Sequence, residues 1–148
     1  MNYLGSVLFH PVSVNDDYFC HPGNVLIPVY GHIPCGEPKF IDDELNGYLE
    51  IPESMLGIGE FFVLRAKGDS MIGAGIDDGD LVIVKRQNYA EEGEIVVAYV
   101  DGETTLKRIY RNDKQEMIEL RAENTNYKTI FISDCLVLGV AVKVIKDL

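Results

Sequence analysis

The feature that most constrains the fold of this chain is a series of short apolar runs separated by glycine, asparagine and aspartate turns. Aromatic and β-branched residues are frequent in these runs, and such residues favour strands. The runs cover residues 48–52, 61–67, 81–85, 94–100, 103–110, 117–121 and 136–145. Asp101-Gly102 separates two of them and is typical of a tight β-hairpin turn. We therefore predict a mostly β fold of twisted, barrel-like antiparallel sheets with little helix.

Length and composition indicate one globular domain. The 148 residues suffice for a single core and are too few for two ordinary domains. The sequence is 47% hydrophobic, yet no apolar run approaches the length of a membrane span. The N-terminus lacks the basic start of a signal peptide. We expect a soluble, cytoplasmic protein that does not associate with a membrane.

The net charge of −11 argues against nucleic-acid binding by this chain. Proteins that bind nucleic acid through its phosphates carry clustered lysine and arginine. Here carboxylates are spread through the loops without a compensating basic stripe. One acidic cluster, Asp77, Asp78 and Asp80, resembles a cation site, but Gly79 within it favours a tight turn between strands. We expect no direct DNA binding by this chain.

Cysteine and histidine do not form a metal-ligand pattern. Cys20, Cys35 and Cys135 lack metal-ligand spacing, and their odd number gives no disulfide framework. The histidines, His10, His21 and His32, all lie in the least regular third of the chain, where a Ser-His-Asp triad is unattractive. We therefore expect no metal site and no cofactor.

The segment from Lys67 to Val84 places a serine between two predicted strands. Ser70 is surrounded by glycines and acidic residues, and Gly68, Gly73 and Gly75 allow sharp turns and close approach of another backbone. Such a serine is available as a nucleophile, provided that a base activates it. The alternative is that Ser70 caps a short helix before Ile72.

Lys107, within the predicted strand 103–110, is the best-placed candidate base. Lysine replaces histidine in some variants of the serine-protease triad. It must be neutral to act, which requires lowering its pKa by about 3 units through burial. The period of the strand groups Lys107 with Thr105 and Ile109, away from Arg108, which is compatible with a buried face. The alternative is an ordinary exposed strand lysine.

These blocks together resemble the LexA/UmuD family of self-cleaving Ser–Lys peptidase domains. The matching blocks, in the order of that family, are Gly68-Asp69-Ser70-Met71, Gly75-Ile76, Asp78-Gly79-Asp80, Glu94-Ile95-Val96-Val97-Ala98 and Thr105-Leu106-Lys107-Arg108. The resemblance implies that Ser70 is the nucleophile and Lys107 the general base. It also implies that the backbone N–H groups of Asp69 and Ser70 form the oxyanion hole, with Met71 packed beneath the nucleophile.

The same resemblance gives a role to the proline-rich stretch upstream. Residues 25–31 form an extended apolar segment, which Pro28 restricts to a sheet edge or a mobile position. The following segment contains Cys35-Gly36, at the position where family members cleave their own chain between a small residue and glycine. Pro34 departs from the family pattern, because proline has no N–H to donate to an edge strand. Without the downstream serine and lysine, this stretch would be interpreted as a turn.

We accordingly divide the chain into an arm or linker remnant at 1–24, a cleavage-site segment at 25–47 and a peptidase and dimerisation domain at 48–148. The resemblance implies the regulatory half of an SOS-type or phage-type repressor, a homodimer stimulated by the RecA–single-stranded-DNA filament. The alternatives are a UmuD-like accessory protein of a translesion polymerase and a non-cleaving dimerisation module. A signal peptidase shares the Ser–Lys chemistry but needs a membrane anchor.

Overall fold

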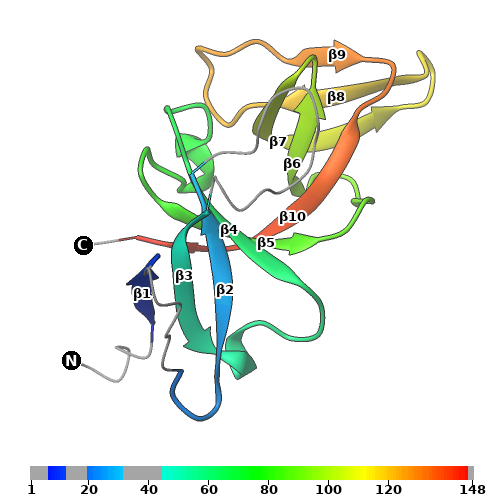
Figure 1. The fold of residues 1–148 in the computed structure, drawn as a ribbon. Coiled ribbons are helices and arrows are strands. Elements are labelled where there is room, and N and C mark those ends of the chain that lie inside the picture. Colours follow the sequence, from blue (N-terminus) through cyan, green and yellow to red (C-terminus); the bar gives the residue numbers. More distant parts are fainter. Residues whose placement is uncertain (1–6, 13–19, 32–44, 147–148) are drawn as a thin grey trace.

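The computed structural model describes residues 7–12, 20–31 and 45–146, and these residues form strands connected by turns and single-turn 3-10 helices (Figure 1). The elements in chain order are β1 (Leu8–Pro11), β2 (Asn24–Tyr30), β3 (Leu45–Pro52), η3 (Glu53–Met55), β4 (Phe61–Arg65), η4 (Ile72–Ala74), β5 (Leu81–Arg86), β6 (Ile95–Val100), β7 (Glu103–Asn112), β8 (Met117–Arg121), β9 (Ile130–Ile132) and β10 (Leu136–Ile145). The prediction of a mostly β fold with little helix is confirmed.

The strands form one sheet in the order β1-β3-β2-β4-β5-β10-β6-β7-β8-β9. It is a mixed sheet, because β2 and β4 are parallel while the other pairs are antiparallel. The parallel pair arises because β3 runs back along β2, and a short connection through η3 returns β4 to the other side of β2. Within the described residues the sheet does not close, since β1 and β9 are its two edges.

Strand β10 joins the two halves of the sheet. Its first residues pair with β6, and the residues from Gly139 onward pair with β5 (Figure 1). Gly139 lies where the pairings overlap, and a Cβ atom there would lie 2.5 Å from the carbonyl oxygen of Lys85. Only glycine permits this close approach. Through β10, the β4–β5 side of the sheet is held against the β6–β7 side.

Each predicted run overlaps a strand of the structure. Asp101 and Gly102 both have positive φ, +50° and +85°, as a two-residue hairpin turn requires. β1 and β9 were not predicted because both are short and lack a clear alternation. The edge position predicted for residues 25–31 holds only for the first part of this segment, because β2 lies between β3 and β4 but pairs with β4 only at its end. Pro28 is tolerated there because the pairing with β4 involves only Val29 and Tyr30.

One of the buried clusters lies at the junction of the two halves. It contains Tyr30, Phe62, Met71, Ile76, Val82, Val84 and Val97, which come from strands on both sides of β10 and from the turn after β4. Met71, only 3% exposed, extends this core beneath residues 68–73, the segment with Ser70 that is called the serine turn below. The serine turn is therefore fixed from below by apolar burial, which is the dominant stabilising term in such a core.

The acidic cluster forms a turn. The Asp80 N–H donates to the Asp77 carbonyl at 3.1 Å, and the Asp77 N–H donates to the Asp80 carboxylate at 2.8 Å. Gly79 has a φ of +90°, which favours glycine. Lys146 lies 2.8 Å from the Asp77 carboxylate and 3.0 Å from that of Asp80. The positive charge beside this acidic turn is thus the ammonium group of Lys146.

Across the described ranges, no set of three or more histidine, cysteine, aspartate or glutamate side chains is arranged to hold a metal ion. Nor does any helix within these ranges have the length and hydropathy needed to cross a membrane.

Candidate active site

Ser70 lies on the turn between β4 and η4. This turn begins at Gly68, whose φ of +79° favours glycine. The residue that caps η4 is Met71, and no side-chain hydrogen bond caps this helix. The alternative role of Ser70 as a helix cap is therefore wrong. Its half-buried hydroxyl instead faces strand β7.

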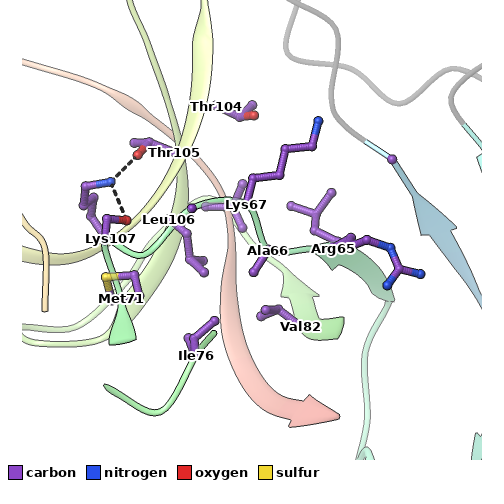
Figure 2. A pocket seen from close by; sticks show the side chains of 15 residues that line it. Arg65, Ala66, Lys67, Met71, Ile76, Val82, Thr104, Thr105, Leu106 and Lys107 are labelled. Carbon is purple, nitrogen blue, oxygen red and sulfur yellow. Dashed lines mark hydrogen bonds between the residues drawn. The ribbon is translucent and has the colours of Figure 1, made fainter. Parts of the chain in front are cut away.

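The side chain of Lys107 extends toward this hydroxyl from β7, and the backbone of Lys107 pairs with Val96 of β6. The ammonium Nζ lies 3.4 Å from Ser70 Oγ and donates a hydrogen bond to Thr105 Oγ1 at 2.7 Å (Figure 2). Lys107 is only 8% exposed, so the alternative of an ordinary exposed strand lysine is wrong. Thr105 and Lys107 share a face of β7 because they are two residues apart.

The electrostatic environment of Lys107 is unusual for a buried cation. Among the residues that the structure describes, no carboxylate forms an ion pair with it. Burial lowers the pKa of Lys107 because it removes water from the charged form. The neutral amine, which has a lone pair to accept a proton, is therefore more accessible here than on a surface lysine.

Ser70 and Lys107 open onto a cleft of about 190 Å³. Apolar side chains of Ile76 and Val82 line one part of it, and Lys107 with Thr105 lines another (Figure 2). Leu64 adds to the apolar lining. Gly31, which follows β2, also contributes to the wall. Arg65, Lys67 and Thr104 add polar groups to the lining. A cleft with an apolar floor and several polar groups can bind a substrate segment.

A strand edge lies beside the cleft. Residues 103–107 of β7 pair with β6 on one side, and the pairing of β7 with β8 begins only at Arg108. Among the described strands, none pairs with the other side of residues 103–107. Such an edge can accept an extended peptide as an additional strand.

The other predicted site residues are only partly covered by the structure. Asp69 and Ser70 are described, and both lie on the exposed turn where an oxyanion hole is predicted. Cys35 and Gly36, the predicted cleavage site, lie outside the described residues, as do Pro34 and His32. Neither of the two described histidines is part of the cleft lining, because His10 and His21 bind the carboxylate of Glu50.

Sequence reasoning missed the loop that follows β8, defined here as residues 122–127. It supplies a backbone hydrogen bond from the Glu123 N–H to the Ser70 carbonyl at 2.8 Å and a second from the Gly73 N–H to the Glu123 carbonyl at 2.8 Å. Asn124 and Asn126 in this stretch indicate only one of the asparagine turns between strands. Asparagine-rich loops are common, and contacts across more than fifty residues leave no local signal.

Ser70 and the buried Lys107 lie in one cleft of a mostly β domain, and the family match identifies this domain as peptidase-type. The chain belongs to the Peptidase S24-like family, which matches residues 28–142. It is a LexA/UmuD-like peptidase domain, as the resemblance implied.

The relatives of known name support this membership. The chain is 39% identical to the LexA repressor of Caldicellulosiruptor saccharolyticus over 133 residues, which are 90% of this chain and 65% of that protein. It is 41% identical to the LexA repressor of Syntrophomonas wolfei, over 86% of this chain and 62% of that protein. The LexA repressor of Thermotoga maritima is 43% identical, over 82% of this chain and 62% of that protein. The chain thus spans less than two thirds of these curated relatives.

Proposed function

We propose that this chain is the autoproteolytic regulatory domain of a LexA-like repressor and cleaves its own Cys35-Gly36 bond by a Ser–Lys mechanism. The observation that carries the proposal is the position of the buried Lys107 Nζ, 3.4 Å from Ser70 Oγ, without a described carboxylate partner. A structural lysine at this depth would be expected to have a compensating charge. An uncompensated lysine beside a hydroxyl suits general-base catalysis.

In the proposed reaction, neutral Lys107 accepts the proton of Ser70 while Oγ attacks the carbonyl carbon of Cys35. The backbone N–H groups of Asp69 and Ser70 stabilise the resulting oxyanion. The C–N bond to Gly36 then breaks, and Lys107 returns the proton to the leaving amine. Water hydrolyses the Cys35 ester of Ser70, with Lys107 again as the base. The products are a Cys35 carboxylate and a Gly36 amine.

Thr105 orients the base in this scheme. A neutral lysine amine has two N–H bonds and one lone pair. When one N–H donates to Thr105 Oγ1, 2.7 Å away, the lone pair is free to accept the hydrogen of the Ser70 hydroxyl. Thr105 is therefore a positioning residue for the proton transfer.

The substrate segment is tethered to the cleft. Gly31 lines the cleft, and Cys35 follows it by four residues in the sequence. Four extended residues span at most about 14 Å, so Cys35 can lie no farther than this from Gly31. A tethered segment has a high effective concentration, so affinity for it can be weak. The edge of β7 at residues 103–107 offers backbone partners for such a segment. Pro34 would contribute no N–H to that pairing, which slows docking.

The wider role is proposed from the relatives. Each relative described above is a LexA repressor, which favours the repressor over the UmuD-like alternative. We propose a homodimer whose self-cleavage is stimulated by the RecA–single-stranded-DNA filament, as the family resemblance implies. With a net charge of −11, this chain is not proposed to contact DNA itself.

The test is to incubate the purified chain from about pH 7 to about pH 10 and to follow its intact mass. We expect one cut, giving residues 1–35 and 36–148, with a rate that rises with pH as Lys107 loses its proton. Ser70→Ala and Lys107→Ala should abolish it. Lys143→Ala, which alters an exposed strand lysine, is the matched control and should cleave normally.

A wild-type chain that stays intact across this range, even with an activated RecA filament, would refute the proposal. The domain would then be a dimerisation module of the same fold. Cleavage that persists in Lys107→Ala would instead refute the role of the lysine.

A further inference from the structure

The loop 122–127 contacts the serine turn through side chains as well as backbone, and the proposed mechanism does not use these contacts. Asn124 Nδ2 donates to the Asp69 carbonyl at 2.9 Å, and the Tyr127 hydroxyl donates to the Asp69 carboxylate at 2.5 Å. With the two Glu123 backbone bonds, the loop binds four groups of the turn: the Asp69 side chain, the Asp69 carbonyl, the Ser70 carbonyl and the Gly73 N–H.

The hydrogen bond to the Asp69 carbonyl has a geometric consequence for Ser70. The Asp69 C=O and the Ser70 N–H belong to the same peptide group, which is planar and trans. Their directions are therefore opposite. The Asp69 carbonyl oxygen accepts a long hydrogen bond from the Ile72 N–H, 3.4 Å, and the shorter one from Asn124, so the Ser70 N–H is directed away from the loop. That N–H is one of the two donors assigned to the oxyanion hole.

The amide of Asn124 is itself held in one orientation. Its Oδ1 accepts a hydrogen bond from the Asn126 N–H at 3.0 Å, and a backbone N–H can only donate. Nδ2 must therefore be the atom that faces Asp69. The turn is closed by the Tyr127 N–H, which donates to the Asn124 carbonyl at 3.1 Å. Asn124 is thus a rigid donor.

The loop is also anchored to the strand that carries the base. Arg108, next to Lys107, forms an ion pair with Glu123 and donates to the Gly93 carbonyl at 2.7 Å. On the other side, a Cβ atom at Gly73 would lie 2.6 Å from the Glu123 carbonyl oxygen, so glycine is required for this contact. The loop therefore connects the serine turn to β7 and thereby fixes the position of Ser70 relative to Lys107.

We propose that Asn124 is a positioning residue of the peptidase, which aims the Ser70 N–H at the oxyanion of the reaction. The inference rests on the proposed self-cleavage and adds to it a residue that touches neither the substrate nor the base. Tyr127 has a supporting role, because its bond to the Asp69 side chain restrains the same residue. The bond to Asp69 raises the pKa of Tyr127, so the hydroxyl keeps its proton to a higher pH than an ordinary tyrosine does.

The test compares Asn124→Ala and Asn124→Leu with Asn126→Ala. The Asn124 variants are neutral, so they leave the charge around Lys107 unchanged, and leucine nearly keeps the shape of asparagine. Asn126→Ala removes an exposed amide from the same loop and is the matched control. Cleavage rates are measured from about pH 7 to about pH 10, together with the thermal midpoint of each variant.

We expect the Asn124 variants to lower the plateau rate about 10- to 100-fold, near the low end of the loss caused by removing an oxyanion donor. The midpoint of the pH profile should stay at the wild-type value, because Lys107 is untouched. Asn126→Ala should cleave at the wild-type rate. A purely structural role would instead lower the thermal midpoint and leave the plateau rate of the folded protein intact.

The inference is overturned if the Asn124 variants cleave at the wild-type rate, if their loss of rate is matched by Asn126→Ala, or if the pH midpoint moves while the plateau stays. These outcomes all require a wild-type chain that cleaves in a Ser70-dependent manner. A wild-type chain that does not cleave refutes the proposed function itself, so the two failures are distinguishable.

Discussion

Two buried ionisable side chains in this domain are treated in opposite ways. Glu50 on β3 is fully buried and accepts four hydrogen bonds, from the Asn24 amide, the His21 backbone N–H and the rings of His10 and His21. Lys107 on β7 is nearly as buried, but its described partners are two hydroxyl groups. The Glu50 carboxylate is therefore surrounded by hydrogen-bond donors, whereas the Lys107 side chain has no carboxylate partner among the described residues.

The pKa of each group is lowered, but for different reasons. Burial alone would raise the pKa of Glu50, and the hydrogen bonds from Asn24, His21 and His10 outweigh it and lower that pKa to about 2. Burial is the cause that lowers the pKa of Lys107. In the carboxylate the charged form is favoured, whereas in the lysine it is disfavoured. A compensated charge stabilises the fold, and an uncompensated one is available for proton transfer.

The position of Glu50 explains what its compensation achieves. His10 lies on β1, Asn24 begins β2 and His21 lies in the turn before it, so the Glu50 carboxylate connects β1, β2 and β3 at one edge of the sheet (Figure 1). This cluster holds the first described segments of the chain against β3. By contrast, the contacts of Lys107 connect β7 only to the serine turn.

The largest effect expected from this comparison is that of Glu50→Gln. A glutamine keeps the shape but places an NH₂ group against donors, so buried N–H groups lose their acceptor. We expect a loss of about 3 kcal/mol in the free energy of unfolding, the usual cost of breaking a buried charge network. Chemical denaturation measures it, with Glu103→Gln, an exposed carboxylate, as the control.

The same variant tests whether Glu50 is separate from the chemistry. The pH midpoint of self-cleavage should be the same in Glu50→Gln as in the wild type at a temperature where both are folded. A shifted midpoint would show that Glu50 and Lys107 are coupled and would contradict the separation of the two groups described above.

Acid should weaken the Glu50 cluster in a defined range. The pKa of Glu50 is about 2 in the folded protein and about 4.5 ordinarily, so the unfolded chain binds the proton first as the pH falls. The stabilising contribution is therefore complete above about pH 4.5 and is lost towards about pH 2. The difference in unfolding free energy between wild type and Glu50→Gln should shrink over this range. A constant difference would mean that the carboxylate charge is not what the cluster recognises.

The sequence predicted the two sites unequally. The sequence singled out Ser70 and Lys107 as candidates because each lies in a local pattern, a glycine-flanked turn and an alternating strand, and because the blocks occur in a family order. Glu50 was missed, although residues 48–52 were predicted as a strand. Leu49 and Ile51 beside it are also buried, so both faces of β3 are covered and alternation does not separate them. Its partners lie 26 to 40 residues away in the sequence.

The fold was predicted in the same uneven way. Alternation and turn residues are local, and they located every long strand and the Asp101-Gly102 hairpin. The parallel pairing of β2 with β4 and the junction at β10 depend on which distant strands pair, which short-range patterns do not encode. The ties of Asn124 to the serine turn belong to the same class of long-range contact.

Thr105→Val tests whether the proposed action of Lys107 as a base depends on its hydrogen bond to a hydroxyl group. Valine keeps the β-branched shape and removes the hydroxyl that binds Nζ at 2.7 Å. We expect self-cleavage at a fixed pH to slow about tenfold, or about 1.4 kcal/mol in the barrier. Thr105→Ser, which retains the hydroxyl, should restore most of the rate. If serine fails where threonine succeeds, packing and not the hydrogen bond is what matters.

The smallest effect is a gain in stability from removing the buried charge of Lys107. At neutral pH the folded protein must either bury an uncompensated ammonium or release its proton, while the unfolded lysine stays charged. Lys107→Met removes this cost, and we expect about 1 kcal/mol of added stability together with complete loss of cleavage. Because the folded pKa of Lys107 is lowered, the stability of the wild type rises as the pH increases from that pKa towards about 10.5, its ordinary value. The advantage of Lys107→Met should therefore diminish over that range.

Lys143→Met, at an exposed position on β10, is the control and should show no such pH-dependent gain in stability. A Lys107→Met variant that is less stable than the wild type at neutral pH would show that the two hydroxyl contacts outweigh the cost of the buried charge.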